Sequence, residues 1–312
     1  MYPMDRIALG LAALGRPAYI NLGRDGALPP VRDVASMRAA TFTVLDDAYA
    51  AGIRWVDVAR SYGRSEEFLA GWLDERGHAD VVVSSKWGYA YVGDWRLDAE
   101  VHEVKEHSAA RFAAQWAETL ALLGDRVSLY QVHSLTVDSP LFTDEPLIEA
   151  LAELSANGVA VGFSTSGPAQ ADAIERAFAL EVAGQPVFSA VQSTWNLLET
   201  SAGAALAAAH AAGNRVLVKE TLANGRLAVE APQAVLDVAE AHGVGPDAVA
   251  VAAVLARDWA DTVVIGPASA PQLVANLRAT TLSLSTDEEA ALAGLAENPG
   301  EYWRHRSSLG WH

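Results

Sequence analysis

The chain has 312 residues, of which 51% are hydrophobic and 20% charged, a composition typical of a folded globular protein with a large core. Its net charge of −17, with no cluster of Lys and Arg, argues against binding to a nucleic-acid backbone, and the lack of cysteine excludes disulfides. No apolar stretch approaches the roughly eighteen residues of a membrane span. We therefore expect a cytoplasmic protein that binds neither nucleic acid nor membrane. The sequence leaves the oligomeric state open.

Short apolar, β-branched runs alternate with amphipathic windows along the whole chain. The runs predict strands at 7–12, 53–58, 80–85, 127–132, 159–164, 188–193, 215–219 and 262–266. The windows predict helices at 36–51, 65–76, 108–123, 145–157, 168–180, 199–212, 233–257, 269–279 and 286–297. Several windows stop at glycines that suit left-handed caps: Gly52, Gly77, Gly124, Gly158 and Gly213. The last window opens with Thr286-Asp-Glu-Glu289, which predicts a capping box.

Eight strands that are each followed by a helix predict an α/β fold, a parallel (β/α)8 TIM barrel that spans 1–312 as a single domain. The alternative is an open doubly wound sheet, which usually carries Gly-x-Gly-x-x-Gly after its first strand, and the segment 15–19 here does not match. Two segments exceed what a barrel needs. We expect the aromatic-rich loop 87–107, after the third strand, to bind substrate, and 298–312 to form a C-terminal extension.

Four titratable residues lie at or just after predicted strand ends: Asp57, Tyr62, Lys86 and His133. Active sites of parallel barrels lie at this end of the strands. Taken singly, each residue also has an ordinary structural role, as a helix cap, a loop aromatic, a surface charge or a buried histidine. Together they can deliver a proton to a carbonyl oxygen, so we interpret them as a catalytic tetrad.

The motifs around these residues extend over nearly the whole chain. They are Trp55-Val-Asp57-Val-Ala-Arg-Ser-Tyr62-Gly63-Arg-Ser-Glu66, Ser85-Lys86, Leu129-Tyr-Gln-Val-His133, Val161-Gly-Phe-Ser164, Val191-Gln192, and Val264-Ile-Gly266 followed by Gln272 and Asn276. In this order they resemble the aldo-keto reductase superfamily. The resemblance implies a β/α barrel that uses a nicotinamide cofactor without a Rossmann domain.

The resemblance also implies an NAD(P)(H)-dependent oxidoreductase that interconverts an aldehyde or ketone and an alcohol by hydride transfer. Tyr62 would be the general acid for reduction and the base for oxidation. Because a free phenol has a pKa of about 10, we expect the Lys86 ammonium, held by Asp57, to lower it. His133 would orient the substrate carbonyl, and the hydride chemistry would belong to the cofactor.

Carry-over from the family gives the expected cofactor residues as Ser164, Thr165, Gln192, Lys219, Leu222, Gly266, Gln272 and Asn276. Three of them depart from the common pattern. Thr165 stands where many members have Asn, Lys219 where an aromatic often stacks on the nicotinamide, and Gln272 where some members have an Arg for the 2′-phosphate. We expect NADP(H) rather than NAD(H), with Arg226 or Arg278 as the cation.

The aromatic residues Trp87, Tyr89 and Trp95 suggest a pocket for an apolar or aryl carbonyl compound, a small-molecule substrate. Packing of this loop onto the barrel is the alternative. Aldose dehydrogenation is the alternative reaction, and a cofactor-binding regulatory protein with little turnover is the alternative class. We expect no metal, because His102-Glu103 and His107 do not have the His-Glu-x-x-His spacing of zinc proteases.

Overall fold

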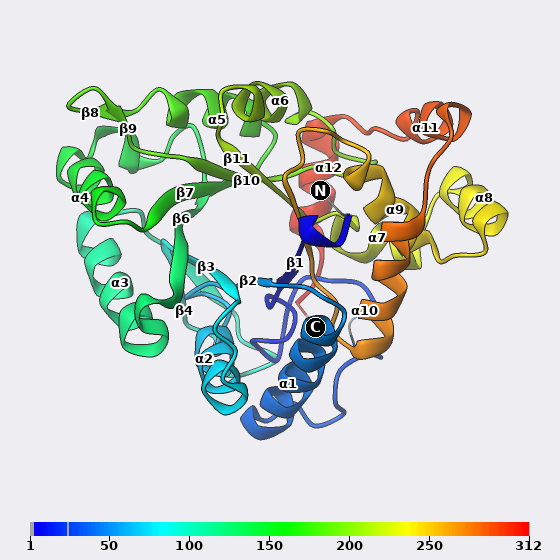
Figure 1. The fold of residues 1–312 in the computed structure, drawn as a ribbon, viewed down its shortest axis with the longest axis horizontal. Coiled ribbons are helices and arrows are strands. Elements are labelled where there is room, and N and C mark those ends of the chain that lie inside the picture. The colour runs from blue at the N-terminus through cyan, green and yellow to red at the C-terminus, as the bar shows by residue number, and fades with distance from the viewer. Residues whose placement is uncertain (1–2, 24, 312) are drawn as a thin grey trace.

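The computed structural model, which describes residues 3–23 and 25–311, is a closed barrel of eight parallel strands (Figure 1). Around the barrel the strand order is β1-β12-β11-β10-β7-β6-β3-β2. The strands are β1 (Ile7–Gly10), β2 (Trp55–Asp57), β3 (Val82–Trp87), β6 (Val127–Leu135), β7 (Ala160–Thr165), β10 (Ala190–Thr194), β11 (Arg215–Lys219) and β12 (Thr262–Ile265). Each predicted strand overlaps one of these, so the predicted (β/α)8 barrel is confirmed.

Helices surround the barrel on its outer face (Figure 1). The α-helices of the described residues are α1 (Val34–Ala50), α2 (Ser65–Arg76), α3 (Ala109–Leu123), α4 (Glu145–Ala156), α5 (Gln170–Phe178), α6 (Gly203–Ala211), α7 (Arg226–Val229), α8 (Gln233–His242), α9 (Pro246–Leu255), α10 (Ala270–Leu277), α11 (Thr286–Ala293) and α12 (Pro299–Ser308), the last of which lies at the carboxyl end of the barrel. The single helix expected at 233–257 is two helices, because Gly243 adopts a left-handed φ of 61° and Pro246 starts a new one. The extension 298–312 contains α12, which we did not predict.

The five glycines predicted as helix caps lie at or next to helix ends. Gly52, Gly77, Gly124, Gly158 and Gly213 all have positive φ, between 60° and 100°. The capping box of α11 lies one residue earlier than predicted. Its N-cap is Ser285, whose Oγ accepts from Glu288 N (3.3 Å) while Ser285 N donates to Glu288 Oε2 (2.7 Å).

The amino half of the barrel interior is filled by side chains. Small and branched residues from β1, β6, β10, β11 and β12 form a separate buried cluster: Ala8, Leu129, Ala190, Leu217 and Val264. The larger core lies between the strands and the outer helices, where β-branched and aromatic residues pack against helix faces. A filled interior leaves the carboxyl ends of the strands as the place for a site.

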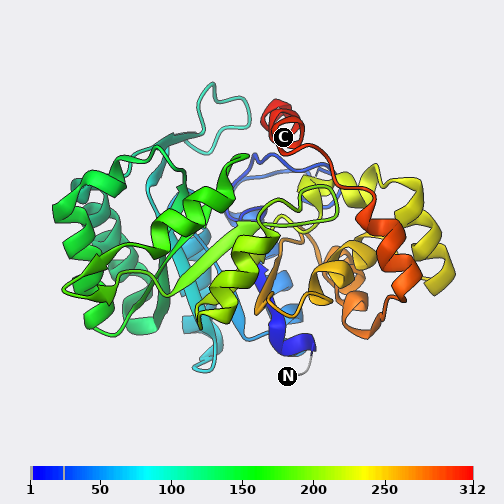
Figure 2. The ribbon, with the colours of Figure 1, turned by 90° about the horizontal axis from the view of Figure 1, so that it is seen from above.

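Three segments gather at that end of the barrel: the loop after β1, helix α12 and a hairpin (Figure 2). The hairpin consists of β4 (Tyr89–Tyr91) and β5 (Glu103–Lys105), which pair antiparallel, so the predicted loop 87–107 is partly a two-stranded sheet. A second small hairpin, β8 (Glu181–Val182) with β9 (Gln185–Pro186), precedes β10.

Within the described residues, no single helix is long and apolar enough to cross a membrane. The pair α8 and α9 meets the same criteria only when the two helices are joined across a 93° bend.

Candidate active site

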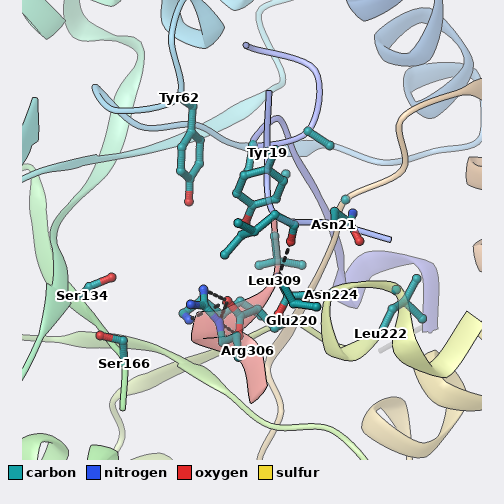
Figure 3. Close-up of a pocket in the computed structure, with 18 of the residues that line it drawn as sticks. Tyr19, Asn21, Tyr62, Ser134, Ser166, Glu220, Leu222, Asn224, Arg306 and Leu309 are labelled. Carbon is teal, nitrogen blue, oxygen red and sulfur yellow. Dashed lines mark hydrogen bonds and ion pairs between the residues drawn. The ribbon is translucent and has the colours of Figure 1, made fainter. Parts of the chain in front are cut away.

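A cavity of about 370 Å³ opens at the carboxyl ends of the strands (Figure 3). Strand ends contribute Asp57, His133 and Gln192 to its wall, and Tyr62 points its hydroxyl into it. The loop after β1, the hairpin, α12 and the tail that follows it complete the wall with Tyr19, Glu103, Arg306 and Trp311. Residues far apart in the sequence therefore meet in one pocket.

Asp57 and Lys86 form a buried ion pair at the base of the cavity. Lys86 Nζ contacts Asp57 Oδ2 and donates to the Val58 carbonyl (3.1 Å), with the lysine side chain fully buried. Asp57 Oδ1 accepts from Ser84 Oγ (2.7 Å) and Gln192 Nε2 (3.1 Å). Burial lowers the pKa of Lys86, and the Asp57 carboxylate opposes this effect. The pair is thus held rigidly, and its two charges largely cancel.

Tyr62 and His133 face each other next to this pair. The Tyr62 hydroxyl is 3.5 Å from His133 Nε2, and the two rings meet edge to face with their centroids 5.4 Å apart. His133 Nδ1 lies 3.3 Å from Ser61 Oγ, and Lys86 Nζ is 4.9 Å from the centre of the Tyr62 ring. The structure therefore brings together all four residues of the predicted tetrad.

A bulge in β6 aims His133 at the cavity. The predicted strand ends at 132, but β6 continues to Leu135 and its register with β7 shifts between Val132 and Leu135. Ser134 has a φ of 54° and donates its N–H to Ser164 Oγ (2.8 Å). The His133 carbonyl accepts from His107 Nε2 (2.9 Å), so both polar groups of the peptide bond that follows His133 are tied to neighbouring segments.

The two rings have opposite pKa shifts. Burial raises the pKa of Tyr62 well above 10, the Asp57 carboxylate raises it further, and Arg16 opposes them. Burial lowers the pKa of His133 well below 6.5, and the ammonium of Lys86 adds to this. At neutral pH Tyr62 is thus a protonated donor and His133 an uncharged imidazole. Our expectation that Lys86 would lower the pKa of Tyr62 is not met, since Asp57 offsets the lysine charge.

Four of the expected cofactor residues line the cavity: Gln192, Lys219, Leu222 and Gly266. Ser164 lies directly behind the wall, where its Oγ accepts from Ser134 N. Thr165 is turned into the wall, because its Oγ1 bonds to Ser193 Oγ (2.7 Å) and Gln170 Oε1 (3.3 Å). Ser166, which we did not predict, faces the cavity in place of the Thr165 side chain (Figure 3).

Lys219 belongs to a buried charge cluster. Its Nζ donates to Thr194 Oγ1 (2.8 Å) and lies 3.7 Å from Glu220 Oε1. Glu220 accepts two 3.0 Å bonds from Arg306 Nε, which comes from α12 (Figure 3). Burial lowers the pKa of Lys219 to about 8. Burial also acts to raise the pKa of Glu220, but the charges of Arg306 and Lys219 prevail and lower it to about 2.

Gln272 and Asn276 lie on α10, outside the residues that line this cavity. Gln272 Oε1 accepts from Ala268 N (2.8 Å). Asn276 Nδ2 donates to Asp247 Oδ2 (2.7 Å), while its buried Oδ1 has no hydrogen-bond partner among the described residues. Arg226 pairs with Glu297, with Nη1 and Oε2 3.2 Å apart.

Of the three aromatics expected in the substrate pocket, Tyr89 lines the cavity. Trp87 is fully buried against Phe112, with ring centroids 5.1 Å apart. Trp95 donates its indole N–H to the Arg32 carbonyl (2.8 Å) and packs on Phe68. Trp87 and Trp95 therefore anchor the loop and lie outside the residues that line the cavity.

Sequence reasoning missed several residues of the wall. Arg16 and Tyr19 lie in the segment 15–19, and Glu103 and Trp311 lie in the hairpin and the tail. A buried arginine has no sequence signature of its own, but Arg16 lies in the loop that follows the first strand, and such loops face the site in a barrel. Its place in this loop was the sequence signal that could have identified Arg16 as a residue of the cavity wall.

The chain is thus a parallel β/α barrel with Asp57, Tyr62, Lys86 and His133 gathered at the carboxyl ends of its strands. The model of the Aldo/keto reductase family matches residues 7–297, and the chain belongs to this family.

Individual relatives agree with this assignment. Aldo-keto reductase str7 of Strobilurus tenacellus is 27% identical over 293 residues, which cover 83% of each chain. Norsolorinic acid reductase of Aspergillus flavus is 28% identical over 165 residues, 51% of this chain and 41% of that protein. Aldo-keto reductase AKR11C1 from Bacillus halodurans, in its holo form, shares the fold with a TM-score of 0.68 at 21% identity, covering 94% of this chain and 92% of that chain.

Proposed function

We propose that the protein interconverts an aldehyde or ketone and the corresponding alcohol with a nicotinamide cofactor, and that Tyr62 is its general acid and base. The contact between the Tyr62 hydroxyl and His133 Nε2 inside the cavity, beside the buried Asp57–Lys86 pair, carries this proposal. A carbonyl oxygen placed between these two groups accepts a hydrogen bond from each. Tyr62 then gives its proton to that oxygen during reduction and takes it back during oxidation.

The neutral imidazole of His133 orients the carbonyl, and its low pKa keeps it from competing with Tyr62 as the acid. Asp57 and Lys86 form the rigid floor on which the Tyr62 ring lies. The cofactor would supply the hydride to the carbonyl carbon. The contribution of the chain is to place the proton donor and to surround it with fixed charges.

The residues around the cavity fit a nicotinamide dinucleotide. Gln192 and Lys219 would face the nicotinamide, and Leu222 and Asn224 the pyrophosphate. Two buried amide oxygens, Asn224 Oδ1 on the cavity wall and Asn276 Oδ1 on α10, have no hydrogen-bond partner among the described residues. Such acceptors suit the hydroxyl and amino donors of ribose and adenine.

Selectivity for the 2′-phosphate is weaker in our proposal than the sequence suggested. Gln272 carries no charge, and the guanidinium of Arg226 is already paired with Glu297. We expect NADPH to bind more tightly than NADH by less than about tenfold, or about 1.4 kcal/mol. Fluorescence titration with both cofactors tests this: a preference for NADPH above a hundredfold, or tighter binding of NADH, would contradict it.

The cavity also favours a second candidate, oxidation of an aldose. Trp87 and Trp95 do not provide the aryl pocket, whereas the Glu103 carboxylate lies on the wall and is 18% exposed. A carboxylate accepts hydrogen bonds from sugar hydroxyls, whereas an unsubstituted aryl ring has no donor to offer it. Initial rates on a panel of aryl aldehydes and a panel of aldoses separate the two: turnover confined to the aldoses assigns the second.

Tyr62→Phe tests whether the protein is an enzyme at all. We expect this variant to lose turnover by at least a hundredfold, the order of effect of general acid catalysis, while cofactor affinity changes little. Equal residual rates in the wild type and the variant would instead assign a cofactor-binding regulatory protein.

A further inference from the structure

Arg16 is a buried charge beside the proposed acid, and the proposed reaction leaves it without a role. Its side chain is 1% exposed. Its Nη1 donates to the Ser61 carbonyl (3.0 Å) and to Glu103 Oε1 (2.6 Å). The arginine thus links the loop after β1 to the segment that carries Tyr62 and to strand β5 of the hairpin.

Two glycines bring Arg16 to this place. Gly63 has a φ of 59°, and a Cβ there would lie 2.5 Å from the Gly15 carbonyl oxygen and 2.9 Å from Arg16 Cβ. A Cβ at Gly15 would lie 2.3 Å from the Tyr62 carbonyl oxygen. The N–H of Arg64 also donates to the Gly15 carbonyl (2.8 Å). The two loops therefore touch backbone to backbone, so the distance between Arg16 and Tyr62 is fixed by the fold.

Aromatic rings enclose the guanidinium of Arg16. Its central carbon lies 5.1 Å from the ring centre of Tyr62, 4.5 Å from that of Tyr19 and 4.9 Å from that of Trp311. Each is within the distance of about 6 Å at which a cation is attracted to a ring. Because the rings exclude water, the charge of Arg16 acts on Tyr62 with little screening.

We propose that Arg16 is a positioning residue for Tyr62: it holds the phenol toward His133 and supplies the positive charge that Lys86, tied to Asp57, does not. Glu103 holds Arg16 in place and partly offsets its charge. The catalytic meaning of this arrangement rests on the proposed function.

The charged and titratable groups that share the cavity with Tyr62 or contact its ring come from every neighbouring segment: Arg16, Tyr19, Asp57, Lys86, Tyr89, Glu103, His133, Lys219, Glu220 and Arg306. Burial is the main cause of the high pKa of Tyr62, and Asp57, Glu103 and Glu220 act in the same direction. Arg16 acts against them. The two partners of the Arg16–Glu103 pair therefore shift the pKa of Tyr62 in opposite directions.

This opposition is the basis of the test. We expect Arg16→Gln to raise the pKa of Tyr62 and Glu103→Gln to lower it. In alcohol oxidation, where Tyr62 acts as the base, Arg16→Gln is expected to reduce kcat at pH 8 about tenfold and to move the pH profile upward, while Glu103→Gln moves it downward. A purely structural ion pair would lose activity in both variants with an unchanged profile.

Titration of the protein labelled with ¹³C at tyrosine Cζ gives a readout that needs no turnover. The chain has eight tyrosines, and Tyr62→Phe identifies the signal of Tyr62. Shifts of this signal with opposite sign in the two variants support the proposal. Shifts of the same sign, or none, overturn it. If Arg16→Gln does not fold, Glu103→Gln alone decides by the direction of its shift, and Arg16→Lys, which keeps the charge, should titrate like the wild type.

An exposed pair provides the matched control. Arg64 and Glu67 lie 3.2 Å apart with side chains 47% and 48% exposed, close to Tyr62 in the sequence. We expect Arg64→Gln and Glu67→Gln to leave the Tyr62 titration unchanged, because water screens their charges. Failure of every carbonyl and alcohol substrate would refute the proposed function, while the titration would still test the role of Arg16.

Discussion

The buried pair of Asp57 and Lys86 yields a prediction about stability that can be worked out in some detail. The Asp57→Asn substitution keeps the shape of the side chain at this position. The Lys86 ammonium then loses its carboxylate partner and keeps its hydrogen bond to the Val58 carbonyl. Breaking a buried pair in this way costs about 3–5 kcal/mol. We therefore expect a loss of free energy of unfolding of that size at pH 7.

The same variant should regain stability as the pH rises. Burial lowers the pKa of Lys86 in the folded state, and removal of Asp57, which opposes that effect, lowers it further. The unfolded chain keeps its proton up to a pKa of about 10.4. Between these two pKa values the unfolded state binds more protons, so stability increases with pH, by at most about 1.4 kcal/mol per pH unit. Above the pKa of this lysine in the unfolded chain, Lys86 is uncharged in both states, so burial of an ammonium no longer destabilises the fold.

Urea unfolding at pH 7, 8 and 9, followed by tryptophan fluorescence, measures this difference. The exposed Asp74, paired with Arg126 at 2.5 Å, offers a control: Asp74→Asn should follow the wild type at every pH. If the unfolding free energy of Asp57→Asn ran parallel to that of the wild type over this range, Lys86 would not be the buried titrating group that we describe.

Two further changes test the packing around the cavity. Gly63→Ala should lower the free energy of unfolding by about 3 kcal/mol, because a left-handed φ and the contact with the loop after β1 act together. Gly77→Ala, at φ 67° with open space around the added Cβ, should lower it by about 1 kcal/mol. Equal losses of free energy in urea unfolding would exclude an effect of the contact. Arg306→Ala should cost about 3 kcal/mol at pH 7, since it removes the main partner of Glu220. Because the pKa of Glu220 is lowered to about 2, its pairing stabilises the fold above pH 4.5 and is lost as the pH falls toward 2, so the gap to the wild type should narrow in acid; a constant gap would contradict this.

The fold and the proximity of Asp57, Tyr62, Lys86 and His133 could be predicted because both depend on regular features of the sequence. Parallel strands with alternating helices place all their carboxyl ends at one edge, so residues such as Asp57 and His133 had to come close together. The cap glycines were predictable for a similar reason, as a left-handed residue at a helix end has a local cause.

Other features depended on contacts between distant segments. The bulge in β6 relies on Ser164, a residue of the neighbouring strand, which bonds the N–H of Ser134. Thr165 and Ser166 are adjacent, and only the local course of β7 decides which of them faces the cavity. Trp95 is an aromatic residue in a long loop and so resembled a pocket residue in the sequence, yet the hydrogen bond from its indole N–H to the Arg32 carbonyl anchors the loop. Such choices have no local sequence signal.

The cavity surrounds its proton donor with paired charges. Three cation–carboxylate pairs meet around Tyr62 and His133: Lys86 with Asp57, Arg16 with Glu103, and Arg306 with Glu220. Glu220 has Lys219 as a second cation, 3.7 Å away, and because the opposite charges partly cancel, burial is the main cause of the pKa shifts of both rings. The balance is also delicate, since removal of one partner leaves a full charge in a place that water does not screen. In our proposal the proton affinity of Tyr62 therefore depends, after burial, on which partner of each pair acts more strongly on the phenol: Asp57 in the pair with Lys86, and Arg16 in the pair with Glu103.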